Sequence, residues 1–146
     1  METTNVHQTK KTTGKGALWT GRVITVLCVL FLLVDGGMKV VKSVASMEGS
    51  VQLGWPESAV QPIGIVLVIC TLLYIIPRTS ILGAILLTGY LGGATSVMVR
   101  AMQPGHPYFF PVAFSVLVWA GLFLRDDRLR TLIPFRKEKK EMKRFN

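Results

Sequence analysis

Four long apolar stretches dominate this chain of 146 residues and restrict it to very few folds. They cover residues 18–41, 59–76, 81–99 and 108–124. The apolar core of a bilayer is about 30 Å thick, and a helix needs about 20 residues to cross it. The second and third stretches meet that length almost uninterrupted, the first includes Arg22, Asp35 and Lys39, and the fourth is short. The pattern predicts an all-α integral membrane protein.

The composition agrees with membrane residence and argues against nucleic-acid binding. Half of the residues are hydrophobic, 17% are charged and the mean hydropathy is +0.46, which is too apolar for a soluble domain of this length. The net charge of +9 comes from cations in the tails and beside the apolar stretches, where they meet anionic lipid headgroups. We therefore expect the lipid bilayer, and no nucleic acid, among the partners.

Lys and Arg are distributed unevenly between the two sides of the predicted spans. If the N-terminus is cytoplasmic, 14 of them lie inside and three, Lys39, Lys42 and Arg100, lie outside. Cytoplasmic segments of membrane proteins are enriched in these residues. Four spans return the chain to its starting side. The pattern therefore predicts an antiparallel four-helix bundle with both the N- and C-termini cytoplasmic.

The segments around the spans define the expected domain organisation. Residues 1–16 are polar and rich in Thr and Lys, which predicts a disordered cytoplasmic tail. Residues 17–135 form one four-span membrane domain, and residues 136–146 form a basic cytoplasmic tail. Residues 42–58 form an external loop whose apolar residues recur at helical spacing, which indicates a short helix on the membrane surface.

Asp35 is the most unusual residue of the first stretch. It lies about 24 Å along the helix from Trp19, below the outer headgroup level, and Lys39 follows one turn later on the same face. A carboxylate at that depth is costly unless it is paired and faces the protein interior, so the spacing predicts an ion pair. The pair has two interpretations: a structural contact in which Lys39 neutralises Asp35, or a functional site that binds a ligand or a proton.

One face of the third stretch carries small residues next to a tyrosine. The residues are Gly89, Tyr90, Gly92, Gly93 and Ser96. In lipid, small residues let helix backbones approach closely, so we expect this face to pack against another helix. The alternatives are a ligand groove or a dimer face. Tyr90 borders this face and would donate a hydrogen bond to a ligand or to a neighbouring helix.

Residue types for catalysis or metal binding are sparse. Cys28 and Cys70 are isolated in the first two stretches, where buried cysteines act as small hydrophobic residues. His7 lies in the N-terminal tail and His106 in a short loop, so no intramembrane pair could bind haem. We expect no catalytic residues, no metal site and no cofactor from these residues.

Several strings together resemble the DoxX-like family of bacterial four-helix membrane proteins, over about residues 18–135. The strings are Asp35-Gly36-x-x-Lys39, Gly54-Trp55-Pro56-Glu57-Ser58, Gln61-Pro62-Ile63-Gly64, Tyr74-Ile75-Ile76-Pro77-Arg78-Thr79, residues 83–94, and Trp119-x-Gly121-Leu122-x-Leu124-Arg125-Asp126. The resemblance implies a four-helix bundle in the bacterial inner membrane. Many relatives carry a histidine where this chain has Met98, so the departure argues against a role that needs imidazole here.

The sequence leaves three functions open. The first is a non-catalytic accessory or interaction subunit with a membrane partner protein. The second is the membrane subunit of a quinone-linked oxidoreductase, which would bind a lipid-soluble quinone against Gly89, Tyr90 and Gly93 and a redox partner protein. The resemblance supports the second, because wider relatives include a membrane subunit of a thiosulfate:quinone oxidoreductase. The third, small-solute transport, has less support because four short spans without a repeat provide little alternating-access machinery.

Overall fold

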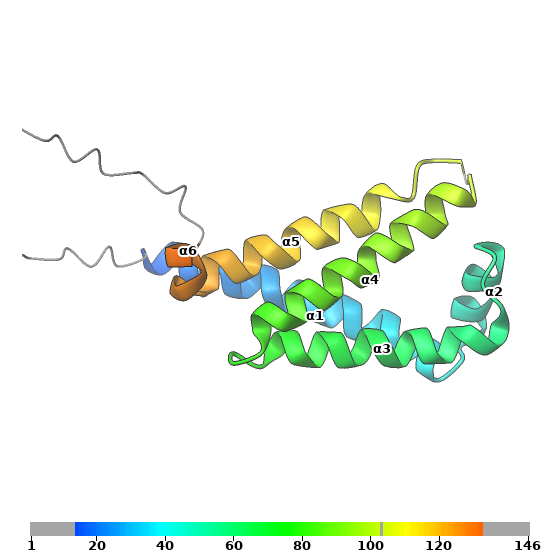
Figure 1. Cartoon of the computed structure of the whole chain (residues 1–146), viewed down its shortest axis with the longest axis horizontal. Helices are drawn as coiled ribbons and strands as arrows, with labels where there is room; N and C mark the ends of the chain where they lie inside the picture. The colour runs from blue at the N-terminus through cyan, green and yellow to red at the C-terminus, as the bar shows by residue number, and fades with distance from the viewer. Residues whose placement is uncertain (1–13, 103, 133–146) are drawn as a thin grey trace, which may run out of the picture.

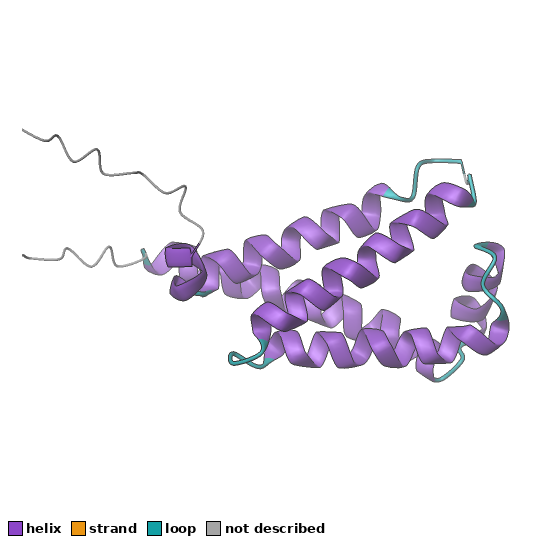
Figure 2. Cartoon of the chain, viewed as in Figure 1, coloured by secondary structure: helices purple, strands orange, loops and turns teal. Residues whose placement is uncertain are grey.

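The computed structural model describes residues 14–102 and 104–132, and the regular structure in this part of the chain is helical throughout (Figure 2). The elements are α1 (Lys15–Val40), α2 (Val44–Gln52), α3 (Glu57–Ile75), α4 (Ser80–Arg100), α5 (Phe109–Arg125) and α6 (Asp127–Leu132). The predicted all-α class is therefore confirmed.

The four apolar stretches correspond to α1, α3, α4 and α5, with each end within three residues of its predicted place. Three of these helices, α1, α3 and α4, are long and apolar enough to cross a membrane. The fourth, α5, is apolar but has 17 residues. Large hydrophobic side chains remain exposed along the outside of the helices, including Leu27, Val34 and Ile69. A surface of this kind is suited to lipid, and the protein is a membrane protein.

The predicted tails lie mostly outside the described residues. That is true of residues 1–13 and of the whole basic tail at 136–146. Helix α1 begins at Lys15, two residues before the predicted domain boundary at 17. The predicted helix in the 42–58 loop is present as α2, and the Ser43 hydroxyl accepts a hydrogen bond from the Ser46 N–H at its N-terminus.

The four long helices pack as a ring in the order α1, α3, α4, α5 (Figure 1). The end of the ring that holds the 76–79 turn is closed, and we call it the closed end. Here Tyr74, Leu87, Val118 and Leu122 are fully buried. The Tyr74 hydroxyl donates a hydrogen bond to the Val118 carbonyl at 2.8 Å, which joins α3 to α5.

Arg125 adds a second link at the closed end. Its guanidinium donates to the Tyr74 carbonyl at 3.3 Å and lies 5.4 Å from the centre of the Tyr74 ring. Trp119 Nε1 donates to Thr88 Oγ1 at 2.8 Å, which joins α5 to α4. Polar groups that would be costly in an apolar interior are thus used to connect helices.

Glycines set the close helix contacts at the closed end. A Cβ at Gly83 would collide with the Tyr74 backbone, so α3 and α4 touch there. A Cβ at Gly21 would lie 2.7 Å from Leu124 Cβ, and one at Gly121 would lie 2.8 Å from Thr25 Oγ1. These two glycines bring α1 and α5 together. The backbones approach this closely only because no side chain intervenes.

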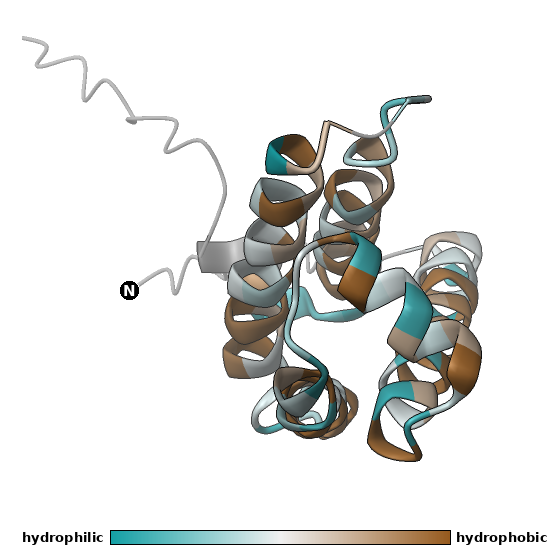
Figure 3. Ribbon diagram, turned by 90° about the vertical axis from the view of Figure 1, so that its right-hand side faces the viewer, coloured by the Kyte–Doolittle hydropathy of each residue, from teal (hydrophilic) through white to brown (hydrophobic). Residues whose placement is uncertain are grey.

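The opposite end, which we call the α2 end, is open. Figure 1 shows α4 and α5 diverging there from α3, and α2 lying at the mouth. Helix α2 packs against α1 and α3, and the backbone of its described residues does not come close to the backbone of α4 or α5. Seen from this end in Figure 3, α2 stands in front of the space between the long helices.

Candidate ligand-binding cavity

The separation of the helices at the α2 end creates a cavity of about 660 Å³. Its lining comes from α1, α2, α3, α4 and α5, together with Leu53 and Trp55 after α2. Cavities that hold small organic molecules have volumes in the same range. The cavity is therefore large enough to hold a ligand.

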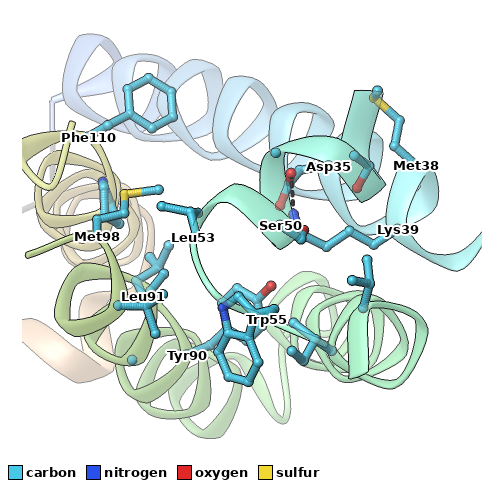
Figure 4. A pocket seen from close by; sticks show the side chains of 18 of the residues that line it. Asp35, Met38, Lys39, Ser50, Leu53, Trp55, Tyr90, Leu91, Met98 and Phe110 are labelled. Atoms are coloured by element: carbon cyan, nitrogen blue, oxygen red, sulfur yellow. Dashed lines mark hydrogen bonds and ion pairs between the residues drawn. The ribbon is translucent and has the colours of Figure 1, made fainter. Parts of the chain in front are cut away.

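One wall of the cavity is polar. Asp35 and Lys39 on α1 form the predicted ion pair, in which Lys39 Nζ donates to Asp35 Oδ1 at 2.5 Å (Figure 4). Their side chains are 39% and 17% exposed, and both line the cavity. From α2, Ser50 lies close to the pair in Figure 4. The ion pair is thus part of a cavity wall that a ligand can reach.

The opposite wall is apolar and comes mainly from α4 and α5. Leu91 and Met98 lie across the cavity from the ion pair (Figure 4). Phe31 of α1 contacts Phe110 and Phe114 of α5, with ring centres 5.3 and 4.6 Å apart. Three aromatic rings therefore separate α1 from α5 at this end and present apolar surface to the cavity.

The structure corrects the expected packing role of the small-residue face on α4. A Cβ added at Gly89, Gly92 or Gly93 would meet no atom within 4 Å, so these glycines bring no helix closer. The packing interpretation is wrong because α4 has already diverged from α3 at this level. Gly89 and Gly93 instead line the cavity, while Gly92 and Ser96 are exposed outside its lining. The ligand-groove and dimer-face alternatives stay predictions.

Tyr90 also lines the cavity from α4. Among the described residues its hydroxyl has no hydrogen-bond partner, unlike the Tyr74 hydroxyl at the closed end. A tyrosine hydroxyl both donates and accepts, so Tyr90 can hydrogen bond to a ligand. Of the predicted residues, the cavity brings together Asp35, Lys39, Gly89, Tyr90 and Gly93.

The other chemically reactive residues lie away from the cavity. Cys28 and Cys70 are buried as free thiols in α1 and α3. His106 lies in the loop before α5, where its ring nitrogen Nδ1 is 3.0 Å from the Tyr108 hydroxyl. His7 is outside the described residues. Within residues 14–102 and 104–132, no group of three or more His, Cys, Asp or Glu side chains could hold a metal ion.

Sequence reasoning missed two parts of the site. The first is the aromatic group of Phe31, Phe110 and Phe114, for which the only signal was the one-turn spacing of Phe110 and Phe114. The second is the contribution of α2, whose Ser46, Ser50 and Gln52 line the cavity. A helix was expected in this loop, but the spacing of its apolar residues gave no indication that it would line a cavity between the long helices.

Comparison with known proteins gives one match. The sequence model of the DoxX-like family matches residues 23–121, which contain every lining residue of the cavity. The match confirms the resemblance that the sequence strings carry. No curated protein and no solved structure matches the chain.

Proposed function

This chain belongs to the DoxX-like family, and we propose that it is a four-span protein of the bacterial inner membrane that binds a lipid-soluble molecule as a non-catalytic accessory subunit. The observation that carries the proposal is the α2-end cavity, with its ion pair on one wall and apolar side chains on the other. Such a cavity suits an amphipathic molecule that arrives from the bilayer.

The proposed topology rests on helix length and charge. Helix α5 has 17 residues and extends about 26 Å, and Phe109 and Arg125 at its two ends are suited to the membrane interfaces. It can therefore form the fourth span with a small adjustment of the bilayer. With 14 of the 17 Lys and Arg residues on one side, both termini are cytoplasmic and the α2 end faces outward.

The residue types around the cavity support binding rather than catalysis. Its lining contains neither histidine nor cysteine, and the single carboxylate is already bonded to Lys39. A nucleophile and a base within hydrogen-bond reach would support a covalent mechanism. The lining instead provides apolar contact and a few hydrogen-bonding groups, which position a ligand without transforming it.

A second candidate function, the membrane subunit of a quinone-linked oxidoreductase, is favoured by one specific feature. Phe31 and Phe114 offer aromatic faces for a quinone ring, and the unpartnered Tyr90 hydroxyl can donate to a quinone carbonyl. In that case the protein would also bind a redox partner. Extraction of quinone from the purified protein, in amounts near one per chain and lost in Tyr90→Phe, would favour this function over the first.

Two leucine substitutions on α4 test the binding proposal. Gly93→Leu places a side chain in the cavity without colliding with the protein, because nothing lies within 4 Å of the new Cβ. Gly92→Leu adds the same side chain on the neighbouring residue, outside the lining. Mass spectrometry of molecules extracted from the purified proteins should show a hydrophobic ligand with wild type and Gly92→Leu, and much less with Gly93→Leu. Equal ligand content in all three would contradict the proposal.

A further inference from the structure

The Asp35–Lys39 pair leaves hydrogen-bonding capacity of both kinds at the cavity wall. An ammonium has three donors and a carboxylate has two acceptor oxygens. The bond between Lys39 Nζ and Asp35 Oδ1 uses one donor and one oxygen. Lys39 is the one hydrogen-bond partner that the Asp35 carboxylate has among the described residues. Two ammonium donors and Asp35 Oδ2 are therefore available to a ligand.

Charge balance limits which head group fits beside this pair. A singly charged head group would be attracted by one member of the pair and repelled by the other. A head group with acceptors alone, such as a quinone, would satisfy Lys39 but would remove water from Asp35 Oδ2 without replacing its hydrogen bond. Leaving such a group unpaired is costly. A head group with an ammonium beside an anion satisfies both residues.

The rest of the cavity suits a lipid with such a head group. Ser46, Ser50 and Gln52 of α2 add hydroxyl and amide groups to the polar wall. Phe110 and Phe114 provide apolar surface for an acyl chain. Trp55, which follows α2 and also lines the cavity, is typical of the headgroup level of a membrane.

We propose that the ligand of this cavity is a zwitterionic phospholipid of the phosphatidylethanolamine type, whose ammonium binds Asp35 and whose phosphate binds Lys39. The proposal rests on the proposed binding function and specifies its ligand. The primary ammonium matters because it carries N–H donors for Asp35, which the quaternary ammonium of phosphatidylcholine lacks.

Short-chain lipids added to the purified full-length protein in detergent test the proposal. Dioctanoyl phosphatidylethanolamine should bind about tenfold more tightly than dioctanoyl phosphatidylcholine, since one charged hydrogen bond is lost with the quaternary head group. Dioctanoyl phosphatidylglycerol, whose head group is anionic, should also bind more weakly. In Asp35→Asn/Lys39→Met the three lipids should bind alike, because the charges that distinguish them are gone.

The leucine variants separate failure of the head-group proposal from failure of the binding function. Loss of phosphatidylethanolamine binding in Gly93→Leu, with retention in Gly92→Leu, supports both. If phosphatidylglycerol or ubiquinone binds more tightly than phosphatidylethanolamine, and Gly93→Leu blocks it, the head-group proposal is overturned and the binding function stands. If Gly93→Leu binds every probe as wild type does, both are overturned.

Discussion

The closed end and the α2 end consist of the same four helices, yet one is tightly packed and the other contains a cavity. At the closed end α1 and α5 meet through Gly21 and Gly121. At the α2 end the same two helices meet through Phe31 and Phe114. Small residues draw backbones together and aromatic rings hold them apart, so the order of small and large residues along α1 and α5 opens the ring between these two helices. Helices α1 and α3 stay close at the α2 end, where a Cβ at Gly64 would collide with Lys39 of α1.

The same contrast occurs within α4. A Cβ at Gly83, near the 76–79 turn, would collide with the Tyr74 backbone, whereas one at Gly89 or Gly93 would meet no atom within 4 Å. Since α4 leaves α3 at an angle, each turn of helix lies further from α3 than the turn before it (Figure 1). A glycine therefore has a structural role at one end of α4 and borders an open space at the other.

The largest expected effect comes from closing the space at Gly83. Gly83→Leu should destabilise the protein by about 3 kcal/mol or more, because the side chain collides with the α3 backbone, which cannot move aside. Unfolding in detergent can be followed with a thiol-reactive dye, since Cys28 and Cys70 are buried in the folded state. Gly93→Leu is the matched control and should melt near ligand-free wild type, because its side chain enters open space. Equal melting temperatures for the two variants would remove the distinction between the ends.

A smaller effect is expected from the ion pair at the α2 end. Asp35→Asn or Lys39→Met alone should lower the free energy of unfolding by about 2 kcal/mol, because each leaves one charge without its partner in a partly buried wall of the cavity. The partial exposure of both side chains keeps the cost below that of a fully buried pair.

The double variant Asp35→Asn/Lys39→Met should recover much of that loss, because no unpaired charge remains. A double-mutant cycle on the melting temperature measures the recovery. Strictly additive losses would show that the two side chains do not stabilise each other.

Removing the Tyr74 hydroxyl should have a smaller effect on stability, and it tests the packing of the closed end. Tyr74→Phe keeps the ring under Arg125 but removes the hydrogen bond to the Val118 carbonyl, which should cost about 1 kcal/mol. Tyr90→Phe, in the same chemical change, should leave the melting temperature of the ligand-free protein unaltered because its hydroxyl has no protein partner. A larger loss of stability from Tyr90→Phe than from Tyr74→Phe would contradict this, because it would mean that the Tyr90 hydroxyl has a partner in the protein.

Much of this fold could be predicted from the sequence because span length and hydropathy are local properties. The ends of α1, α3, α4 and α5 follow from where apolar residues begin and end. The Asp35–Lys39 ion pair could be predicted for the same reason, since residues four apart on a helix lie on the same face whatever else surrounds them.

The role of each glycine could not be predicted in the same way. Gly83 and Gly93 lie on one helix in similarly apolar sequence, and only the angle between α3 and α4 distinguishes them. That angle belongs to the packing of α4 between α3 and α5, and not to the sequence around either glycine. The orientation of α2 toward the cavity is likewise set by its packing on α1 and α3.

The smallest expected effect, and the sharpest comparison of the two ends, comes from alanine at Gly89. Gly89→Ala should stabilise the protein by about 0.5 kcal/mol, because alanine favours the helix over glycine and the added methyl group meets no neighbour. Gly83→Ala makes the same change where the Cβ collides with the Tyr74 backbone, so the steric cost should outweigh the helix preference and lower the melting temperature. The two variants share their chemistry, their helix and their change in volume. A difference in sign between them can therefore come only from what faces α4 at each end, and a shared sign would mean that α4 runs equally close to its neighbours along its whole length.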